Sequence, residues 1–247
     1  MSLVNTIYNI WNVFWLWCRS FPTALVALVS AIIAFLAYVY QRKEARKRTA
    51  CRLAQQYADD ILPRIRYIKK ILELTGVKKY CDKFSGFRDF TTKELDESLR
   101  KAECTADCFL NLFETIDKEM INAAFVNSGF CSREKAFHDS MSALTDADSK
   151  KIAFRKHILD LLNDLEAFSL QFHYNLADEK LVYQSLHQTF LDNMRYWYFF
   201  ISYENRFDQD RSFLNVIWLY QVWERRKNED EKSISKALSK RLTAKKL

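Results

Sequence analysis

Glycine and proline are nearly absent from this chain, and their scarcity constrains its fold more than any other feature. The 247 residues include three Gly and two Pro, whereas average usage of about 7% Gly and 5% Pro would supply more than about 20. Sheet sandwiches and dinucleotide-binding folds need many glycine turns, and a phosphate-binding loop needs a glycine-rich run. The sequence therefore excludes these classes and predicts an all-α protein of long helices joined by short polar loops.

One segment is apolar enough, over a sufficient length, to cross a bilayer. No residue from Ser20 to Gln41 is charged, and the stretch from Phe21 to Tyr40 is almost wholly apolar. About 20 helical residues span the hydrocarbon core of a bilayer, so we expect a single transmembrane helix over 20–41. A buried helix of a soluble protein would rarely stop so sharply at a basic cluster. A cleaved signal peptide would have a shorter apolar stretch and a small-residue cleavage site.

A basic cluster follows this segment directly and predicts its orientation. Its members are Arg42, Lys43, Arg46, Lys47, Arg48 and Arg52. Only Arg19 is charged before the span, so the positive-inside rule places the C-terminal body in the cytoplasm and the N-terminus outside. In a bacterium this is the inner membrane. Such a cluster also suits anionic lipid headgroups. Nucleic-acid binding is the competing interpretation, and the position beside the span favours lipid.

Two patterns near the N-terminus indicate a homo-oligomer. Small residues within the span form pairs four apart that let helices approach closely: Ala27, Ser30, Ala31 and Ala34. Simple tolerance of alanine is the alternative. Residues 1–19 suit an amphipathic helix lying in the membrane interface, with one side formed by Asn5, Asn9 and Asn12. Alternatively, this Asn stripe lines a water-filled path through an oligomer.

The net charge of +7 is distributed unevenly. Residues 53–224 hold 22 basic and 27 acidic side chains, whereas residues 225–247 hold nine basic and three acidic. An acidic body argues against bulk nucleic-acid binding. The tail over 228–247 predicts a basic amphipathic helix, whose apolar stripe is Ile234, Leu238 and Leu242. It suits a membrane surface or the acidic body of a neighbouring subunit, and a frayed solvated end is the alternative.

Start and stop signals divide the chain after the span. A stalk helix over 42–75 should kink at Pro63 and end at Gly76, followed by a cytoplasmic helical bundle over 76–227. Capping signals predict bundle helices over about 91–127, 132–144, 145–176, 177–204 and 211–227. Periodic apolar residues pair the two longest as antiparallel neighbours. The aromatic run from Tyr196 to Tyr203 predicts burial, either in the core or in a subunit interface.

Cysteines and acidic residues give few candidates for chemistry. Cys104 and Cys108 lie four apart on one predicted helix and would share a face. Zinc sites usually place two cysteines in a tight turn, so small buried residues are the preferred interpretation. We expect no cofactor. Glu166 lies between apolar neighbours, and a structural carboxylate partnered by Arg195 is expected there.

Arg133 and His138 form the pattern R-x4-H at the start of a predicted helix. This six-residue pattern resembles the active-site motif of the HEPN ribonucleases, which are helical and build composite sites at dimer interfaces. The resemblance implies that Arg133 and His138 act on an RNA phosphate. No nucleophile elbow or paired-carboxylate arrangement stands out. The sequence therefore favours a protein without catalytic activity and keeps a membrane-tethered HEPN-like ribonuclease as the alternative.

The C-terminal third carries a second resemblance. The stretch LLNDLEAFSLQFHYNLADEKLVYQSLHQTFL, with YENRF and LYQVWERR after it, is similar to a loose family of uncharacterised bacterial helical proteins with one N-terminal membrane span. Small membrane-anchored helical proteins of this layout recur among bacterial antiphage systems. The resulting hypothesis is a membrane-anchored, oligomeric sensor or effector, or a subunit that docks a protein partner.

Overall fold

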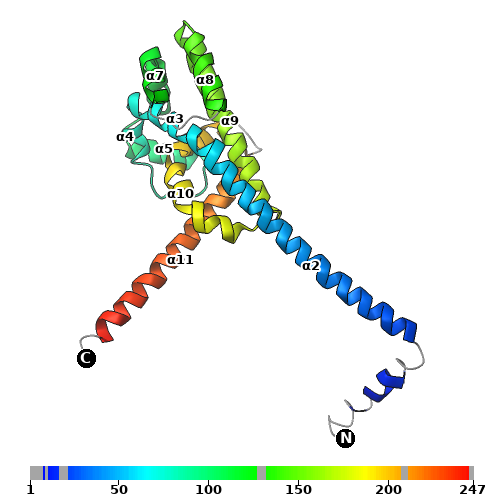
Figure 1. The fold of residues 1–247 in the computed structure, drawn as a ribbon. Helices are drawn as coiled ribbons and strands as arrows, with labels where there is room; N and C mark the ends of the chain where they lie inside the picture. The colour runs from blue at the N-terminus through cyan, green and yellow to red at the C-terminus, as the bar shows by residue number, and fades with distance from the viewer. Residues whose placement is uncertain (1–7, 9–10, 17–21, 127–131, 207–210, 245–247) are drawn as a thin grey trace. The chain divides into compact units, whose positions relative to one another are not determined.

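The computed structural model describes residues 8, 11–16, 22–126, 132–206 and 211–244, and within these ranges the chain forms helices and no strand. The predicted all-α class is confirmed (Figure 1). The chain divides into two compact units, Met1–Arg48 and Thr49–Leu247. The helical elements are α2 (Pro22–Gln56), η1 (Tyr57–Ile61), α3 (Leu62–Leu74), α4 (Lys78–Cys81), α5 (Thr92–Lys101), α6 (Ala106–Asn111), η2 (Leu112–Thr115), α7 (Lys118–Val126), α8 (Ser132–Ala143), α9 (Ala147–His173), α10 (Glu179–Glu204) and α11 (Leu214–Ala244).

Helix α2 carries the predicted membrane segment and is followed without a break by η1 and α3. Element η1 is a π-helical turn, and Pro63 lies directly after it in the first turn of α3. Proline cannot donate a backbone hydrogen bond to the preceding turn, so the regular hydrogen-bond pattern is interrupted where the π turn lies. Gly76, with φ of +78°, follows the end of α3 as predicted.

The predicted single helix over 91–127 is wrong, although its start is right. The hydroxyl of Thr91 accepts a hydrogen bond from the backbone N–H of Glu94 at 3.3 Å. The chain then forms α5, α6, η2 and α7 in place of one helix. Glu103 adopts φ of +58°, and the N–H of Cys104 reaches back to a carbonyl of α5 at 3.0 Å. Helices that end in a left-handed residue usually have glycine there. Because this position holds a glutamate, the sequence does not predict that the helix ends at it.

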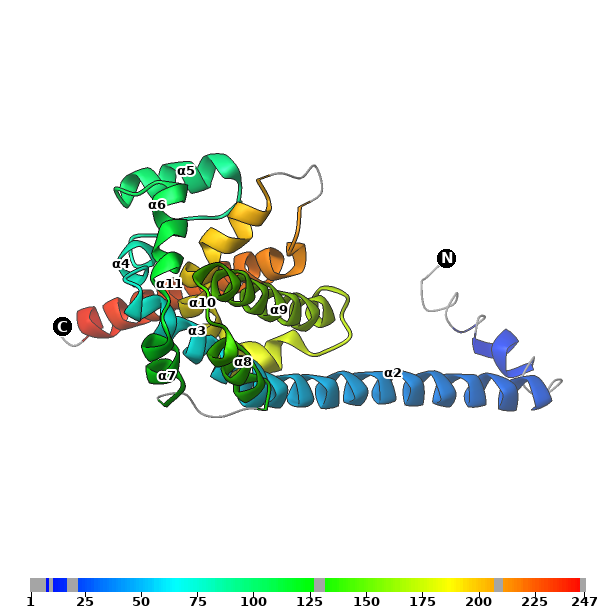
Figure 2. The same cartoon turned by 90° about the horizontal axis from the view of Figure 1, so that it is seen from above.

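Three long helices form the centre of the second unit. The predicted antiparallel arrangement of α9 and α10 is confirmed: Arg155 near the start of α9 pairs with Glu204 at the end of α10, at 2.6 Å. Asp146, one residue after the predicted start, caps α9. Helix α11 packs against both α9 and α10, and α7 and α8 lie beside each other and beside α3 (Figures 1 and 2).

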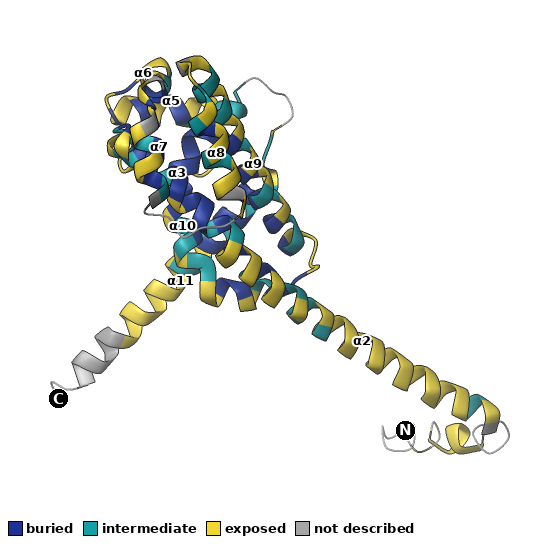
Figure 3. Ribbon diagram, turned by 45° about the horizontal axis from the view of Figure 1, so that its top comes forward, coloured by how far each residue is buried: buried dark blue, intermediate teal, exposed yellow. Residues whose placement is uncertain are grey.

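The aromatic run of α10 lies in the core of the second unit. Burial in the core is one of the two predictions for it, beside burial in a subunit interface. Every residue from Tyr196 to Ile201 is buried (Figure 3). Phe199 stacks on Phe109 of α6 with ring centroids 3.9 Å apart, and Tyr198 stacks on Phe87 with centroids 4.2 Å apart. Aromatic pairs of this kind contribute about 0.5–1.5 kcal/mol beyond burial. The aromatic run therefore ties α10 to short elements far away in sequence.

Glu166 is structural, but its predicted partner is wrong. Its carboxylate accepts hydrogen bonds from the backbone N–H groups of Asn215 at 3.0 Å and Val216 at 2.9 Å. These groups belong to the first turn of α11, whose N–H groups have no partner within the helix and whose dipole favours a negative charge. Arg195 pairs instead with Asp82, at 3.7 Å. Glu166 thus joins α9 to the start of α11.

Candidate functional site

Helix α2 exposes apolar side chains all around its axis in the first unit (Figure 3). The large exposed apolar residues there are Val26, Leu28, Val29, Ile32, Ile33, Phe35, Leu36, Tyr38, Val39 and Tyr40. Among the residues that were placed, one helix, beginning at Thr23, is long and apolar enough to cross a membrane, and protein buries none of its apolar window. Soluble monomers rarely expose apolar patches larger than a few hundred Å². By length and composition, this surface marks α2 as a candidate membrane-spanning helix.

The small residues predicted to mediate self-association lie on this exposed surface. Ala27, Ser30, Ala31 and Ala34 are all exposed. Of the Asn stripe, Asn12 is exposed on a short helical stretch over 11–16, whereas Asn5 and Asn9 lie outside the described residues. Self-association and a polar path through an oligomer therefore stay predictions.

The basic cluster occupies the part of α2 that follows the apolar segment. Arg42, Lys43 and Arg48 are exposed, while Arg46 and Lys47 are half-buried. Lys47 pairs with Glu44 at 3.0 Å, one turn earlier on the same helix. The exposed members present their charges to solvent, and the predicted contact with lipid headgroups stays a prediction.

His138 of the R-x4-H pattern is engaged between two helices. It lies on α8, and its Nε2 is 3.0 Å from Oδ1 of Asn122 on α7. Its ring stacks on Phe125 of α7 with centroids 4.0 Å apart. The side chain of Arg133 lies outside the described part of the chain. The contacts of His138 are those of a packing residue, and its pairing with Arg133 on a substrate stays a prediction.

Cys104 and Cys108 flank a helix start, and the prediction that both lie within one helix is wrong. The left-handed turn at Glu103 ends α5, and the hydroxyl of Thr105 caps α6 by accepting from the N–H of Cys108 at 3.1 Å. Burial, followed by the neighbouring Cys108 thiol, raises the pKa of Cys104 to about 11. Metals bind the thiolate, which this environment disfavours. Across the described ranges, no three His, Cys, Asp or Glu side chains are grouped to hold a metal ion.

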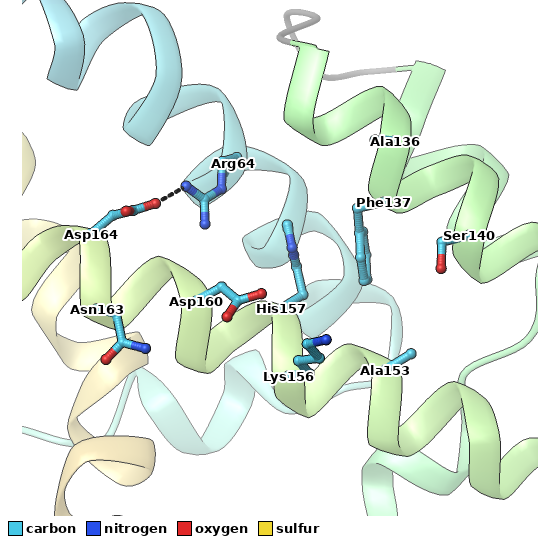
Figure 4. A pocket seen from close by; sticks show the side chains of 10 residues that line it. All are labelled: Arg64, Ala136, Phe137, Ser140, Ala153, Lys156, His157, Asp160, Asn163 and Asp164. Carbon is cyan, nitrogen blue, oxygen red and sulfur yellow. Dashed lines mark hydrogen bonds and ion pairs between the residues drawn. The ribbon is translucent and has the colours of Figure 1, made fainter.

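The second unit has a cleft between α3, α8 and α9 where charged and apolar side chains meet (Figure 4). Its volume is about 550 Å³. Its lining residues are Arg64, Ala136, Phe137, Ser140, Ala153, Lys156, His157, Asp160, Asn163 and Asp164. Small-molecule sites commonly occupy about 300–1,000 Å³ and combine apolar walls with a few placed polar groups. This cleft has both.

Arg64 provides the buried charge of the cleft. It lies on α3, is 2% exposed, and pairs with Asp164 of α9 (Figure 4). Asp60, one turn earlier, is 3.9 Å away. A buried guanidinium needs such partners because the loss of hydration costs several kcal/mol per ion. Within the described residues, its buried Nε has no hydrogen-bond partner.

His157 of α9 lies between Arg64 and Phe137 in Figure 4. It is 7% exposed, and its ring is nearly parallel to that of Phe137, with centroids 3.7 Å apart. Burial and, to a lesser extent, the charge of Arg64 lower the pKa of His157 to about 3, so the imidazole is neutral near pH 7. Its Nε2 has no hydrogen-bond partner among the placed residues. Two buried polar atoms thus lack partners at one cleft.

Sequence reasoning missed this cleft, although a signal was present. Tyr57, Ile61 and Ile68 lie at the spacing of an apolar helix face, and Arg64 occupies the intervening position of that face. A charged residue on an apolar stripe must find a partner when the stripe is buried. The partner, Asp164, lies 100 residues later in the chain, and the spacing on α3 alone cannot identify it.

These features define a class: an all-α protein with one candidate membrane-spanning helix near its N-terminus and a helical unit with a polar cleft. Residues 94–223, about half of the chain, match the family described as "Domain of unknown function (DUF4760)", and the chain belongs to this family. No curated protein and no solved structure matches the chain. The family match covers α8 and α9 of the cleft and stops short of Arg64 and the apolar segment.

Proposed function

We propose that this protein is a membrane-anchored, oligomeric sensor or effector. Helix α2 would hold it in the bacterial inner membrane with its N-terminus outside, and the second unit would receive a signal or a protein partner in the cytoplasm. The observation that carries the proposal is the exposed apolar surface from Val26 to Tyr40, followed at once by basic residues. That order suits a bilayer core and its cytoplasmic face.

Oligomerisation is supported by the small residues on the exposed face of α2. Without a hydrophobic driving force inside a bilayer, close backbone packing holds helices together, and Ala27 and Ala31 leave room for it. Antiphage defence is proposed as the setting by analogy of layout alone, because anchored helical proteins of this size recur there.

The cleft at Arg64 and His157 supports the receiving role of the second unit. Its unpartnered Nε and Nε2 atoms are hydrogen-bonding groups that a ligand or a partner side chain would satisfy. Because these two groups lie on α3 and α9, binding in the cleft would shift those two helices relative to each other.

Expression with dye uptake tests the effector role. Cells that express the protein should take up a membrane-impermeant dye, and Asn9→Leu with Asn12→Leu should relieve uptake by removing polar groups at the membrane. Asn111→Leu with Gln184→Leu, two exposed amide positions of the second unit outside the cleft, is the matched control and should change nothing. Equal uptake with both pairs would leave the Asn stripe a merely interfacial feature.

The mass of the detergent-solubilised protein tests oligomerisation, and RNA profiles test the alternative activity. We expect a defined oligomer, and a monomer would contradict the proposal.

We also expect cellular RNA to stay intact when the protein is expressed. RNA cleavage that His138→Ala abolishes would replace the effector by a membrane-tethered HEPN-like ribonuclease.

A further inference from the structure

The C-terminal half of α11, from Asn228 to Ala244, is exposed wherever its side chains are described. The first turns of this helix pack into the second unit through Val216, Leu219 and Trp223, which are fully buried. Every described side chain from Asn228 to Ala237 is exposed, and the helix continues beyond them to Ala244 (Figures 1 and 3). Arg226 pairs with Glu179, and the hydroxyl of Tyr183 donates to Asp230 at 3.1 Å, so the helix stays tied to α10 as far as Asp230. The described side chains beyond Asp230 are all exposed.

A helix end of this length gains little from its own interactions. From Asn228 to Ala244 the helix extends about 25 Å at 1.5 Å per residue, and most helical stability in proteins comes from packing of an apolar face rather than from the helix itself. Local pairs add little to it, such as the 4.0 Å pair between Lys227 and Glu231, and a hydrogen bond from the Tyr183 hydroxyl holds its start at Asp230. An external surface would stabilise it.

The sequence of this segment indicates the chemistry of that surface. Residues 232–247 contain no acidic side chain and six basic ones: Lys232, Lys236, Lys240, Arg241, Lys245 and Lys246. Ile234 is 58% exposed, and leucines follow it at positions 238 and 242, four and eight residues on. A cationic helix with a narrow apolar stripe suits the boundary between anionic headgroups and acyl chains.

Two sources of negative charge are available, a lipid leaflet and the acidic body of a second copy. Several carboxylates of the body are already engaged internally: Glu94 by backbone N–H groups, Asp164 by Arg64, Glu166 by the start of α11 and Glu179 by Arg226. A carboxylate that already has such a partner attracts the Lys and Arg side chains of a second copy less strongly than an unpartnered carboxylate would. The body thus offers less free charge than its composition suggests.

The leaflet is also close along the chain. The second unit begins at Thr49, nine residues after Tyr40, or about 13 Å of helix. A span that ends at Tyr40 would tether α11 near the bilayer, where effective concentration favours weak contacts. Both basic segments lie on the same side of the span, the side that the positive-inside rule assigns to the anionic cytoplasmic leaflet.

We propose that the C-terminal half of α11, from Asn228 onward, docks onto anionic lipid headgroups of the membrane that anchors the chain. The tether in this inference rests on the proposed membrane anchoring, whereas the cationic surface does not. Docking would fix the second unit at the leaflet, with α11 as a second attachment beside α2.

Hydrogen exchange of the full chain in lipid nanodiscs tests this docking. In nanodiscs with phosphatidylglycerol, amides over 228–244 should exchange at least about tenfold more slowly than in pure phosphatidylcholine. High salt and the variant Lys236→Gln, Lys240→Gln, Arg241→Gln should each remove the difference, since screening and charge loss weaken surface attraction. The variant Lys93→Gln, Lys135→Gln, Lys180→Gln removes equal charge elsewhere and should keep it.

Equal exchange in both lipids would overturn the docking. Protection that persists in detergent and rises with protein concentration would assign the surface to a second copy instead. Flotation with phosphatidylcholine vesicles reports the anchor separately and should be the same for every variant. If the chain fails to float there, the anchor is wrong. In that case, flotation of the unaltered chain with phosphatidylglycerol vesicles, together with no flotation of the tail variant, would still support the docking. No flotation of the unaltered chain with phosphatidylglycerol vesicles would refute the docking.

Discussion

Two helices of this chain carry long apolar stretches, and only one of them is buried by the rest of the protein. In α10, the residues from Tyr196 to Ile201 are buried. The helix packs against α4, α5 and α11, and its aromatic rings stack on Phe87 and on Phe109 of α6. In α2, the residues from Val26 to Tyr40 are exposed. Apolar composition alone does not separate the two helices.

The polar residues at the edges of each stretch separate them. Helix α10 has Asp192 and Arg195 just before its aromatic run and Glu204 just after it, and two of these side chains pair with other elements, Arg195 with Asp82 and Glu204 with Arg155. Helix α2 has no charged residue until Arg42. Protein surroundings supply partners for charges, whereas a bilayer core supplies none. The charges beside an apolar helix therefore indicate which surroundings it needs.

Among the variants considered, Trp223→Ala should cause the largest loss in the free energy of unfolding of the second unit. Trp223 is fully buried, and its Nε1 donates to Glu179 at 2.6 Å. Its truncation should lower the free energy of unfolding of the second unit by about 3–5 kcal/mol. Phe35→Ala on the exposed part of α2 is the control and should leave that unit unchanged. Denaturation of the full chain in mild detergent measures both, and equal losses would mean that α2 is packed against protein.

Breaking the ion pair of the cleft should have the next largest effect. Asp164→Asn leaves Arg64 buried with only the distant Asp60, so the free energy of unfolding should fall by about 2–4 kcal/mol. Arg64→Met should cost less, because Asp164 is 30% exposed and can be rehydrated. The double variant should recover part of the loss of Asp164→Asn. A smaller loss for Asp164→Asn than for Arg64→Met would contradict the burial assigned to Arg64.

His157 should make the second unit sensitive to mild acid. Its folded pKa of about 3 lies below the usual 6.5, so the unfolded chain binds a proton that the folded chain does not. The stabilisation is fully present above pH 6.5 and is lost as pH falls, by about 2 kcal/mol between pH 6.5 and 5. His157→Phe keeps the stacked ring and should flatten the stability profile in this window. An unchanged profile would show that His157 titrates normally.

The cap of α5 should give the smallest effect. Thr91→Ala removes the hydroxyl that accepts from Glu94 and should cost about 1 kcal/mol. Thr92→Ala, at the next and exposed position, should cost less than about 0.5 kcal/mol. Thermal unfolding of the two variants compares them, and equal shifts would place the start of the helix elsewhere.

The sequence predicted the features that local spacing encodes. The all-α class follows from the scarcity of glycine, and the cap at Thr91 and the burial of the aromatic run follow from residues close together in the chain. The break after α5 was missed because Glu103 occupies a backbone conformation usually marked by glycine. The cleft was missed because Arg64 and Asp164 meet only in the folded chain. Asn5, Asn9 and Arg133 were proposed from local patterns and stay untested.

Labelling from one side of the membrane tests the central claim, that α2 is a span with the N-terminus outside and the second unit inside. A Ser2→Cys variant, treated with a membrane-impermeant maleimide in intact spheroplasts, should be labelled at the introduced thiol and not at Cys51, which is exposed on the other side of the apolar segment. Permeabilisation should then expose Cys51 to the reagent. Labelling of Cys51 in intact spheroplasts, or of neither thiol until permeabilisation, would contradict the account.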